Sequence, residues 1–410
     1  MSYIQRAITP ILKQRVSTSK CMLLVGARQV GKSTLIKHEF KDFNRANFDD
    51  RLTRMQAKEE PKLFFLNNPK PLFIDEVQKE SSILEDIKQI VDESDERGMF
   101  ILSGSQKLEL MKGMSESLAG RVSISELTGL SMREIYGVKF NRHFIPTDAY
   151  IKEREKEIVK YDNIWEIIHK GSYPELYDID RDWQEYYSSY VATYLERDIN
   201  ELVAADGITF TKFLTAVAAR TGELLNYSNI AGDVGVSEPT IKNWISILER
   251  TGIVYLLQPY SASALKRAIK TPKLYFRDTG LACYLTRWLT ADTLKCSAVA
   301  GNMFETFVVS EILKSYSNEG KDYRFNIFYY RGKDRNASGE NEIDLVIEED
   351  GVLYPVEIKM SGNPKASMGA TNQVLDKVSD KKRGLGVILC LIDKKTYLRE
   401  NLVALPIEFI

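Results

Sequence analysis

One short stretch near the N-terminus, residues 26–34, constrains this chain more than any other feature. It fits the pattern G-x-x-x-x-G-K-[ST] in full. An apolar run, residues 21–25, precedes it, and a helical pattern, residues 34–40, follows it. A buried strand, a glycine-rich turn and a helix together form a known type of phosphate site. We therefore expect this stretch to bind the phosphates of a nucleotide.

The physical reason for this expectation lies in the backbone. Glycines let the chain curl around a triphosphate, and the amide N–H groups and the positive end of the helix face the phosphates. Lys32 would reach the β- and γ-phosphates of ATP, and the Ser33 hydroxyl would bind Mg²⁺. The residues expected to contact the nucleotide are Gly26, Ala27, Arg28, Gln29, Val30, Gly31, Lys32, Ser33 and Thr34.

A second apolar run, residues 71–74, ends in two acids, Asp75 and Glu76. A buried strand delivers such side chains to its carboxyl end, where ligands lie in open α/β sheets. We expect Asp75 to hold Mg²⁺, directly or through water, and Glu76 to orient the water that attacks ATP. A third strand, residues 99–102, is followed by Ser103 and Ser105, which form either a sensor of the γ-phosphate or a polar turn.

These stretches carry a family resemblance. Residues 26–33, 73–76, 102–105 and the Leu-Ala-Gly-Arg segment ending at Arg121 resemble the ATPases of the AAA superfamily. More closely, they resemble prokaryotic proteins that join such an ATPase to a C-terminal domain of unknown function numbered 4143. The resemblance implies a doubly wound parallel sheet with ATP at its carboxyl edge. It leaves Arg121 either as a finger that contacts a nucleotide, in its own or a neighbouring subunit, or as a surface arginine.

The middle of the chain predicts helices. Residues 225–257 predict a helix, a turn, a second helix capped by Ser237 and then a strand, which together resemble a winged helix. The second helix could read DNA, but its exposed face is mixed in charge and poor in arginine, whereas phosphate contacts need Lys or Arg. We favour a structural or protein-binding role and keep DNA binding as the alternative.

A second candidate site lies in the last third of the chain. Residues 341–347 and 352–359 alternate with period two around an acidic glycine turn, which predicts a β-hairpin. The hairpin would bring Asp344 near Glu357 and Lys359, and the last two share one face of their strand. Two carboxylates beside a lysine predict a divalent-metal site that activates water against a phosphodiester.

The Asp…Glu-x-Lys pattern resembles the restriction-endonuclease-like fold. In that fold a helix before the hairpin often supplies another acid, and Glu305 suits that role, so Asp344, Glu357 and Glu305 are the expected metal ligands. Two functions remain open. In the first, nucleotide state gates a metal-dependent nuclease that acts on DNA. In the second, the protein is an ATP-dependent switch or scaffold whose C-terminal domain binds nucleic acid or a partner protein without cleavage.

Bulk composition sets the remaining expectations. The formal net charge of −1 gives no global basic field. Four cysteines lie far apart, as in a cytoplasmic protein with buried, reduced thiols, and no apolar run is long enough to cross a membrane. A homo-oligomer formed through the ATPase domain is a further option. The expected class is α/β, with four parts: 1–147 (ATPase), 148–224 (helical connection), 225–262 (winged helix) and 263–410 (nuclease-like).

Overall fold

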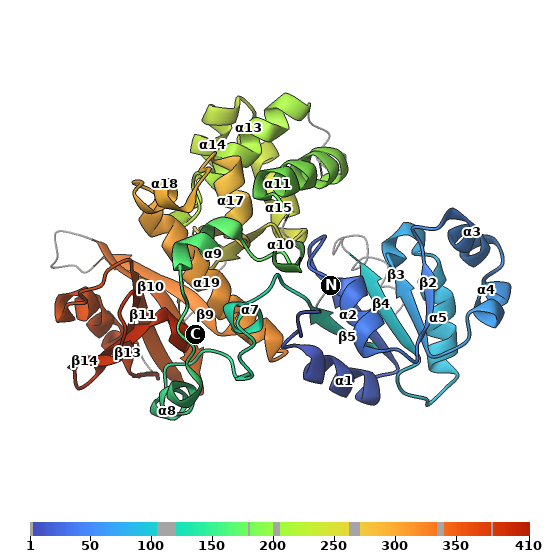
Figure 1. The fold of residues 1–410 in the computed structure, drawn as a ribbon, viewed down its shortest axis with the longest axis horizontal. Coiled ribbons are helices and arrows are strands. Elements are labelled where there is room, and N and C mark those ends of the chain that lie inside the picture. Colours follow the sequence, from blue (N-terminus) through green and yellow to red (C-terminus); the bar gives the residue numbers. More distant parts are fainter. Residues whose placement is uncertain are drawn as a thin grey trace.

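A computed structural model describes residues 3–104, 120–178, 181–199, 206–261, 271–333, 340–378 and 380–410. Figure 1 shows three lobes: an N-terminal α/β lobe, a helical lobe from the middle of the chain, and a C-terminal lobe built on a second large sheet. The overall class is α/β, as predicted.

The N-terminal lobe is built on a parallel five-stranded sheet in the order β2-β3-β4-β1-β5. The strands are β1 (Cys21–Val25), β2 (Asn44–Asn47), β3 (Leu72–Asp75), β4 (Phe100–Gly104) and β5 (Val122–Glu126). The helices are α1 (Thr9–Thr18), α2 (Lys32–Glu39), α3 (Arg51–Glu59), α4 (Pro61–Asn67), η1 (Val77–Glu80) and α5 (Ile83–Asp92). β1, β3 and β4 are buried along their whole length, which explains why they read as continuous apolar runs. The non-sequential strand order is that of a doubly wound sheet.

The helical lobe follows a short crossing segment. The crossing segment carries α7 (Met132–Ile135), α8 (Asp148–Arg154) and η2 (Glu155–Glu157), and α8 lies beside the C-terminal lobe (Figure 1). The helical lobe begins with α9 (Ile164–Lys170), α10 (Glu175–Asp178), α11 (Trp183–Tyr190) and η3 (Val191–Ile199). It continues with α13 (Gly207–Ala218), β6 (Glu223–Leu224), α14 (Tyr227–Val234), α15 (Glu238–Arg250), β7 (Val254–Leu257), β8 (Lys273–Phe276), α17 (Thr279–Leu285) and α18 (Ala291–Lys295). The helix–turn–helix is α14–α15, and β7 follows it in an antiparallel sheet ordered β6-β8-β7.

The C-terminal lobe holds a seven-stranded mixed sheet in the order β14-β15-β13-β11-β10-β9, with β12 paired to β11. Its helices are α19 (Ala300–Asn318), η4 (Tyr323–Phe325), η5 (Ala366–Lys377) and η6 (Ile407–Phe409). Its strands are β9 (Ile327–Lys333), β10 (Glu340–Glu349), β11 (Val352–Lys359), β12 (Lys382–Arg383), β13 (Gly386–Cys390), β14 (Thr396–Arg399) and β15 (Leu402–Pro406). β10 and β11 form the predicted hairpin, with Leu345 opposite Val356.

A single apolar core connects the three lobes. It runs from one face of the N-terminal sheet through the helical lobe to α19 and the C-terminal sheet. α19 is buried along almost its whole length, including polar residues such as Ser310 and Glu311. A second cluster fills the other face of the N-terminal sheet.

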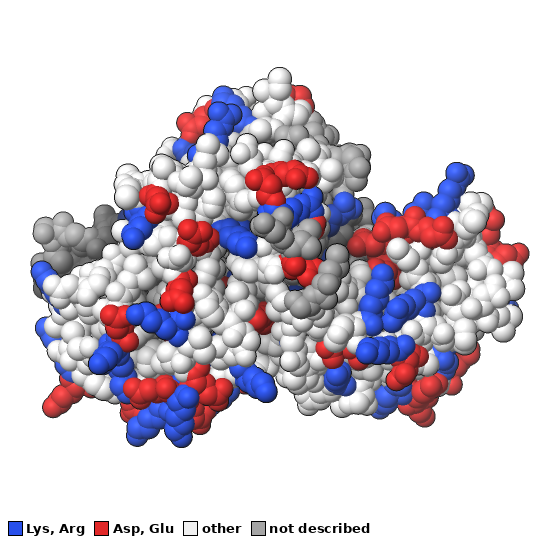
Figure 2. All heavy atoms as spheres, in the orientation of Figure 1, with Lys and Arg blue, Asp and Glu red and all other residues white. Residues whose placement is uncertain are grey.

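The surface charge and the burial of the cysteines can be compared with the expectations from composition. Acidic and basic side chains lie next to one another over all three lobes on the face seen in Figure 2, in keeping with the small net charge. Among the described residues, no helix is both long and apolar enough to cross a membrane. The expectation of four buried thiols was wrong for Cys296, which is exposed, whereas Cys21, Cys283 and Cys390 are buried.

Candidate functional sites

The glycine-rich loop joins β1 to α2, as predicted. Gly31 lies directly before α2 with φ 93°, and Gln29 has φ 62°, so the loop contains two left-handed residues. Glycine is needed at position 26 for another reason. A Cβ atom there would lie 2.3 Å from the carbonyl oxygen of Leu127, which is backbone and cannot move aside. The loop therefore packs tightly against the segment that follows β5.

A cavity of about 720 Å³ opens in front of the loop. Of the predicted nucleotide contacts, those that line it are Arg28, Gln29, Gly31, Lys32, Ser33, Thr34 and Glu76. The N-terminal segment supplies Tyr3, Ile4 and Arg6, and the helical lobe supplies Pro174, Glu175 and Asp178. The cavity is thus shared between two lobes, and it combines P-loop groups with apolar walls that suit a nucleotide.

Lys32 is held inside the loop. Its Nζ donates to the carbonyl oxygens of Gly26 at 3.0 Å and Ala27 at 2.9 Å, and the residue is only 5% exposed. Burial lowers the pKa of Lys32 to about 8, although Glu76 and Asp75 oppose this shift. A phosphate would therefore meet an ammonium group that already lies at the loop.

The two acids lie where the strand pattern predicted them. Asp75 ends β3, is 7% exposed, and accepts a hydrogen bond from the Ser103 hydroxyl at the end of β4. Glu76 follows with φ 55° and accepts a hydrogen bond from Gln78. Ser103 therefore contacts the carboxylate expected to hold Mg²⁺, which favours the sensor interpretation. Ser105 lies outside the described residues.

Arg121 does not lie at this cavity. It stands directly before β5, whose first residue is paired with Cys21 at the start of β1, and it forms an ion pair with Asp92. The loop leaves the other end of β1, about 16 Å away for five residues of strand. The option that Arg121 contacts the nucleotide of its own subunit was therefore wrong. Because β1 and β5 are parallel, Arg121 lies at the amino end of the strands and the loop lies at their carboxyl end.

The structure adds a residue at the loop that no sequence motif indicated. Arg6 is 3% exposed and donates to the carbonyl oxygen of Val30 at 2.8 Å, within the loop itself. Its Nε also forms an ion pair with Glu134 at 2.9 Å. These partners are 24 and 128 residues away in the chain.

The C-terminal hairpin brings together the three predicted residues. Lys359 Nζ lies 2.8 Å from Asp344 Oδ2 and 2.9 Å from Glu357 Oε2. The backbone N–H of Ile358 also donates to Asp344 Oδ2, at 2.8 Å. Asp344 and Glu357 are buried, at 8% and 4% exposure. The Asp…Glu-x-Lys cluster is therefore compact and oriented by the hairpin register.

Electrostatics within this cluster are unusual. Burial and the nearby Asp344 carboxylate raise the pKa of Glu357 to about 8, against the opposing effect of Lys359. Among the described residues Glu357 Oε1 is buried without a hydrogen-bond partner. Burial would lower the pKa of Lys359, but Asp344 and Glu357 outweigh it and the pKa is raised. The Glu357 carboxyl is therefore protonated at neutral pH, beside the Asp344 carboxylate and the charged Lys359.

Glu305 was expected to join this cluster as a third metal ligand. Burial and the nearby Asp344 carboxylate raise the pKa of Glu305, so it lies close to the cluster, but the structure gives its carboxylate other partners. Its carboxylate accepts from the Tyr275 hydroxyl at 2.6 Å and pairs with Lys273 at 3.2 Å. Lys273 also pairs with Glu342 at 2.6 Å. The described part of the chain contains no group of three or more His, Cys, Asp or Glu side chains placed to hold a metal ion. A lysine and a tyrosine hold Glu305 instead.

The fit of a divalent ion follows from these contacts. Asp344 and Glu357 supply the oxygen donors that Mg²⁺ prefers, and Glu357 Oε1 has no other described partner. Lys359 takes the other oxygen of Glu357 and one oxygen of Asp344. The pair fits one divalent ion if Lys359 gives up at least one of these contacts.

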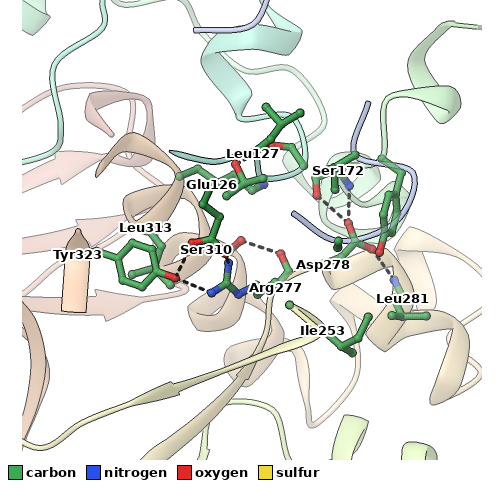
Figure 3. Close-up of a pocket in the computed structure, with 17 residues that line it drawn as sticks. Glu126, Leu127, Ser172, Ile253, Arg277, Asp278, Leu281, Ser310, Leu313 and Tyr323 are labelled. Atoms are coloured by element: carbon green, nitrogen blue, oxygen red, sulfur yellow. Dashed lines mark hydrogen bonds and ion pairs between the residues drawn. The ribbon is translucent and has the colours of Figure 1, made fainter. Parts of the chain in front are cut away.

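A second cavity lies behind the phosphate loop, where the three lobes meet (Figure 3). Ala27 and Val30 of the loop line it, so these two residues face away from the nucleotide cavity. Here Arg277 pairs with Glu126 at 2.9 Å and donates to the Tyr323 hydroxyl. The three side chains come from the end of β8, the end of β5 and the start of η4, so the network joins all three lobes.

Asp278 forms the other half of this junction (Figure 3). It accepts hydrogen bonds from the Ser172 backbone at 2.6 Å, the Tyr187 hydroxyl at 2.6 Å and the N–H of Leu281 at 2.7 Å. Ser172 precedes α10, which borders the nucleotide cavity. The junction therefore ties the wall of the nucleotide cavity to the start of α17 within the helical lobe.

Helix α15 offers little to DNA. Its exposed Lys242 is paired with Glu238 at 2.7 Å on the same helix. The exposed face is thus mixed in charge, as predicted from the sequence, and one of its cations is paired within the helix.

Three family models match separate parts of the chain. Residues 18–136 match a model described as an AAA domain, residues 161–292 match a domain of unknown function (DUF8612), and residues 300–410 match a domain of unknown function (DUF4143). Uncharacterized proteins of Mycobacterium bovis and Mycobacterium tuberculosis are each 27% identical over 375 residues, which is 89% of this chain and 76% of theirs.

Solved structures give weaker likenesses. A RuvB protein from Thermotoga maritima is 16% identical with a TM-score of 0.28, covering 60% of this chain and 85% of its own. A signal-transduction ATPase with a tetratricopeptide repeat sensor from Pyrococcus horikoshii is 10% identical with a TM-score of 0.27, covering 77% of this chain and 47% of its own. These scores are low and carry no functional argument. From the family models and the loop geometry, the chain carries an AAA-type P-loop ATPase domain at its N-terminal end and a domain of unknown function 4143 at its C-terminal end.

Proposed function

We propose that the N-terminal lobe binds Mg·ATP and hydrolyses it. The observation that supports this most directly is the cavity in front of the glycine-rich loop, which Lys32, Ser33 and Glu76 line together. Asp75 lies next to Glu76, at the carboxyl end of the same buried strand. These side-chain types, on these elements, are the ones that phosphoryl transfer to water requires.

Each residue has a separate task in this proposal. Lys32 leaves the carbonyl oxygens of Gly26 and Ala27 to neutralise the β- and γ-phosphates. Ser33 and Asp75 would hold Mg²⁺, and the ion would neutralise charge on the phosphates. Glu76 orients the attacking water and accepts its proton, and Ser103 reports the state of the site through its hydrogen bond to Asp75.

Two variants test the assignment. Calorimetry of Lys32→Ala with Mg·ATP should show strongly weakened binding. Glu76→Gln should bind ATP as the wild type does and release phosphate at least 100-fold more slowly, which is on the order of the contribution of a general base. Wild-type turnover by Glu76→Gln would remove Glu76 from this role. A flat calorimetric trace for folded wild-type protein would remove the nucleotide site itself.

We also propose that nucleotide state controls the C-terminal lobe, and that this lobe acts on DNA. The Asp344–Glu357 pair favours a metal-dependent nuclease. Burial and the nearby Asp344 carboxylate raise the pKa of Glu357, and a divalent cation would take the place of its proton and balance both buried carboxylates. Asp344 and Glu357 would hold the ion, which would activate water, and Lys359 would neutralise the phosphodiester. The alternative is a switch that binds nucleic acid or a partner protein without cleavage.

Incubation with supercoiled plasmid, Mg²⁺ or Mn²⁺, and ATP separates the two. Nicking that disappears in Asp344→Ala but persists in Glu238→Ala, a surface carboxylate of α15, would support the nuclease. If no DNA form is cut under any nucleotide condition, the switch is the better description.

Self-association is the remaining part of the proposal. Arg121 lies at the opposite end of the strands from its own loop, which leaves two options: it contacts the nucleotide of a neighbouring subunit, or it is a surface arginine paired with Asp92. In the first case, light scattering of the wild type with Mg·ATP should show an assembly. A separate assay of phosphate release should then show a lower ATPase rate for Arg121→Ala. A strict monomer with and without ATP would count against any role of Arg121 in catalysis.

A further inference from the structure

Arg6 stands out among the buried charged groups that the proposed mechanism does not use. It lies before α1, far from every motif, yet its guanidinium contacts two segments that meet at the nucleotide cavity. Nη1 donates to Val30 O at 2.8 Å, and Nη2 donates to Thr128 O at 2.7 Å and to Gly129 O at 3.3 Å. Arg6 itself is one of the residues that line the cavity.

The contact with Val30 fixes the direction of one loop amide. In a trans peptide the C=O of one residue and the N–H of the next point in opposite directions. Because Arg6 holds the Val30 carbonyl, the N–H of Gly31 must point away from the guanidinium. Gly31 is the last residue before α2, so its amide belongs to the set of N–H groups that face phosphates in such a loop.

The loop needs such a restraint because a residue other than glycine, Gln29, has a left-handed backbone. Gln29 at φ 62° and Gly31 at φ 93° flank Val30 on either side. Residues in sparsely populated conformations persist only where the surrounding structure holds them. Of the described side chains that hydrogen-bond to the loop backbone, Lys32 holds Gly26 and Ala27, and Arg6 holds Val30.

Glu134 orients Arg6 in turn. Its Oε1 accepts from Arg6 Nε at 2.9 Å and from the N–H of Ala7 at 2.8 Å, and its Oε2 accepts from the N–H of Ser131 at 2.7 Å. Both charged side chains are almost fully buried, at 3% and 1% exposure. The guanidinium is therefore fixed in one plane, as a bidentate backbone contact requires.

We propose that Arg6 is a positioning residue for nucleotide binding: it holds the Val30 carbonyl so that the Gly31 amide is set for the phosphates before ATP arrives. This inference rests on the proposed nucleotide site. Since the loop amides hold the phosphates that ADP and ATP share, loss of Arg6 weakens both nucleotides by the same factor. A residue that contacted only the γ-phosphate would weaken ATP alone.

The test is a calorimetric titration of Arg6→Lys with Mg·ADP and Mg·ATP. Lysine keeps the charge but cannot bind Val30 and Thr128 at once, and we expect affinity for both nucleotides to fall by about 10- to 100-fold. Arg15→Lys is the matched control. Arg15 also binds backbone carbonyl oxygens, those of Ile124 and Gly320, but does not touch the loop. The control should bind both nucleotides as the wild type does, whatever its melting temperature.

The outcomes separate this inference from the proposed function. If wild-type protein binds neither nucleotide, the nucleotide site fails and the role of Arg6 fails with it. If the wild type binds and Arg6→Lys binds equally well, or loses ATP alone, only the role of Arg6 is overturned. Should Arg6→Lys not fold, Glu134→Gln decides, because it frees the guanidinium while keeping an amide in place. We then expect a loss of about 3- to 10-fold for ADP and ATP alike, and unchanged affinity would overturn the inference.

Discussion

Lys32 shows how a buried position changes the chemistry of a motif residue. Its ammonium is held by two loop carbonyls, and burial lowers its pKa to about 8. Bound phosphates favour the charged form, so nucleotide binding above pH 8 requires Lys32 to take up a proton. We expect the affinity for ADP to fall by about tenfold between pH 7 and pH 9, because the charged fraction of the free lysine falls by that factor.

Calorimetry at pH 8.5 in two buffers of different ionisation enthalpy measures the proton uptake directly. Lys32→Arg is the control, since arginine keeps its charge over this range and should show a weaker but pH-independent affinity. Equal apparent enthalpies in both buffers for the wild type would mean that Lys32 is already charged in the free protein.

Single residues were predictable from the sequence where chemistry fixes a residue type at a fixed spacing. The loop, Asp75 with Glu76, and the Asp344–Glu357–Lys359 cluster were found for that reason. Arg6 and Glu134 were missed because a buried ion pair across 128 residues leaves no local pattern. Glu305 was assigned to the wrong partners because its neighbours, Lys273 and Tyr275, reach it only through the pairing of tertiary elements.

At the scale of elements, α19 links the C-terminal lobe to the ATPase lobe. Glu311 on this helix accepts from the N–H of Met132 at 2.8 Å, and Lys314 pairs with Glu311 at 2.8 Å while donating to Leu130 O at 3.0 Å. Earlier on the same helix, Glu305 lies near Asp344 of the C-terminal site. A rigid helix thus joins the segment after β5 to the second candidate site, over about 9 Å from Glu305 to Glu311.

Removal of Glu311 should be costly. Both members of its ion pair are 6% exposed, and Glu311→Ala leaves the Lys314 ammonium buried without its partner. We expect the free energy of unfolding in urea to fall by about 3–5 kcal/mol. Glu238→Ala on α15, whose pair with Lys242 is solvent-exposed, should leave the urea midpoint unchanged. Equal effects of the two substitutions would mean that this contact does not join the lobes.

Elements followed from the sequence better than their arrangement did. Continuous apolar runs gave β1, β3 and β4, and period-two alternation gave the β10–β11 hairpin, whose register only the structure supplied. The packing of α19 against residues 130–132 could not be predicted from the sequence. Residues all round this helix are buried, so its pattern does not indicate which face contacts which neighbour. Where Arg121 lies could be settled only by the parallel pairing of β5 with β1.

For the whole molecule, the shared core makes a prediction about cooperativity. All four tryptophans, Trp165, Trp183, Trp244 and Trp288, lie in the helical lobe, whereas ATP is proposed to bind in front of the N-terminal sheet. One apolar cluster and the Glu126–Arg277–Tyr323 network connect these regions. If the lobes unfold together, a ligand that binds one lobe must raise the free energy of unfolding that tryptophan fluorescence reports for the other.

We therefore expect Mg·ADP at a thousand times its dissociation constant to raise the free energy of unfolding reported by tryptophan by about 4 kcal/mol. Circular dichroism should give a coincident transition, and Lys32→Ala should show no shift. In the opposite outcome, the nucleotide does not shift the tryptophan transition, and circular dichroism shows a second step that the nucleotide does stabilise. The helical lobe would then unfold independently of the ATPase lobe. Arg277→Met then distinguishes the two sources of coupling. If the ion-pair network couples the lobes, Arg277→Met separates the tryptophan transition from the circular-dichroism transition. If the apolar core couples them, the two transitions stay coincident.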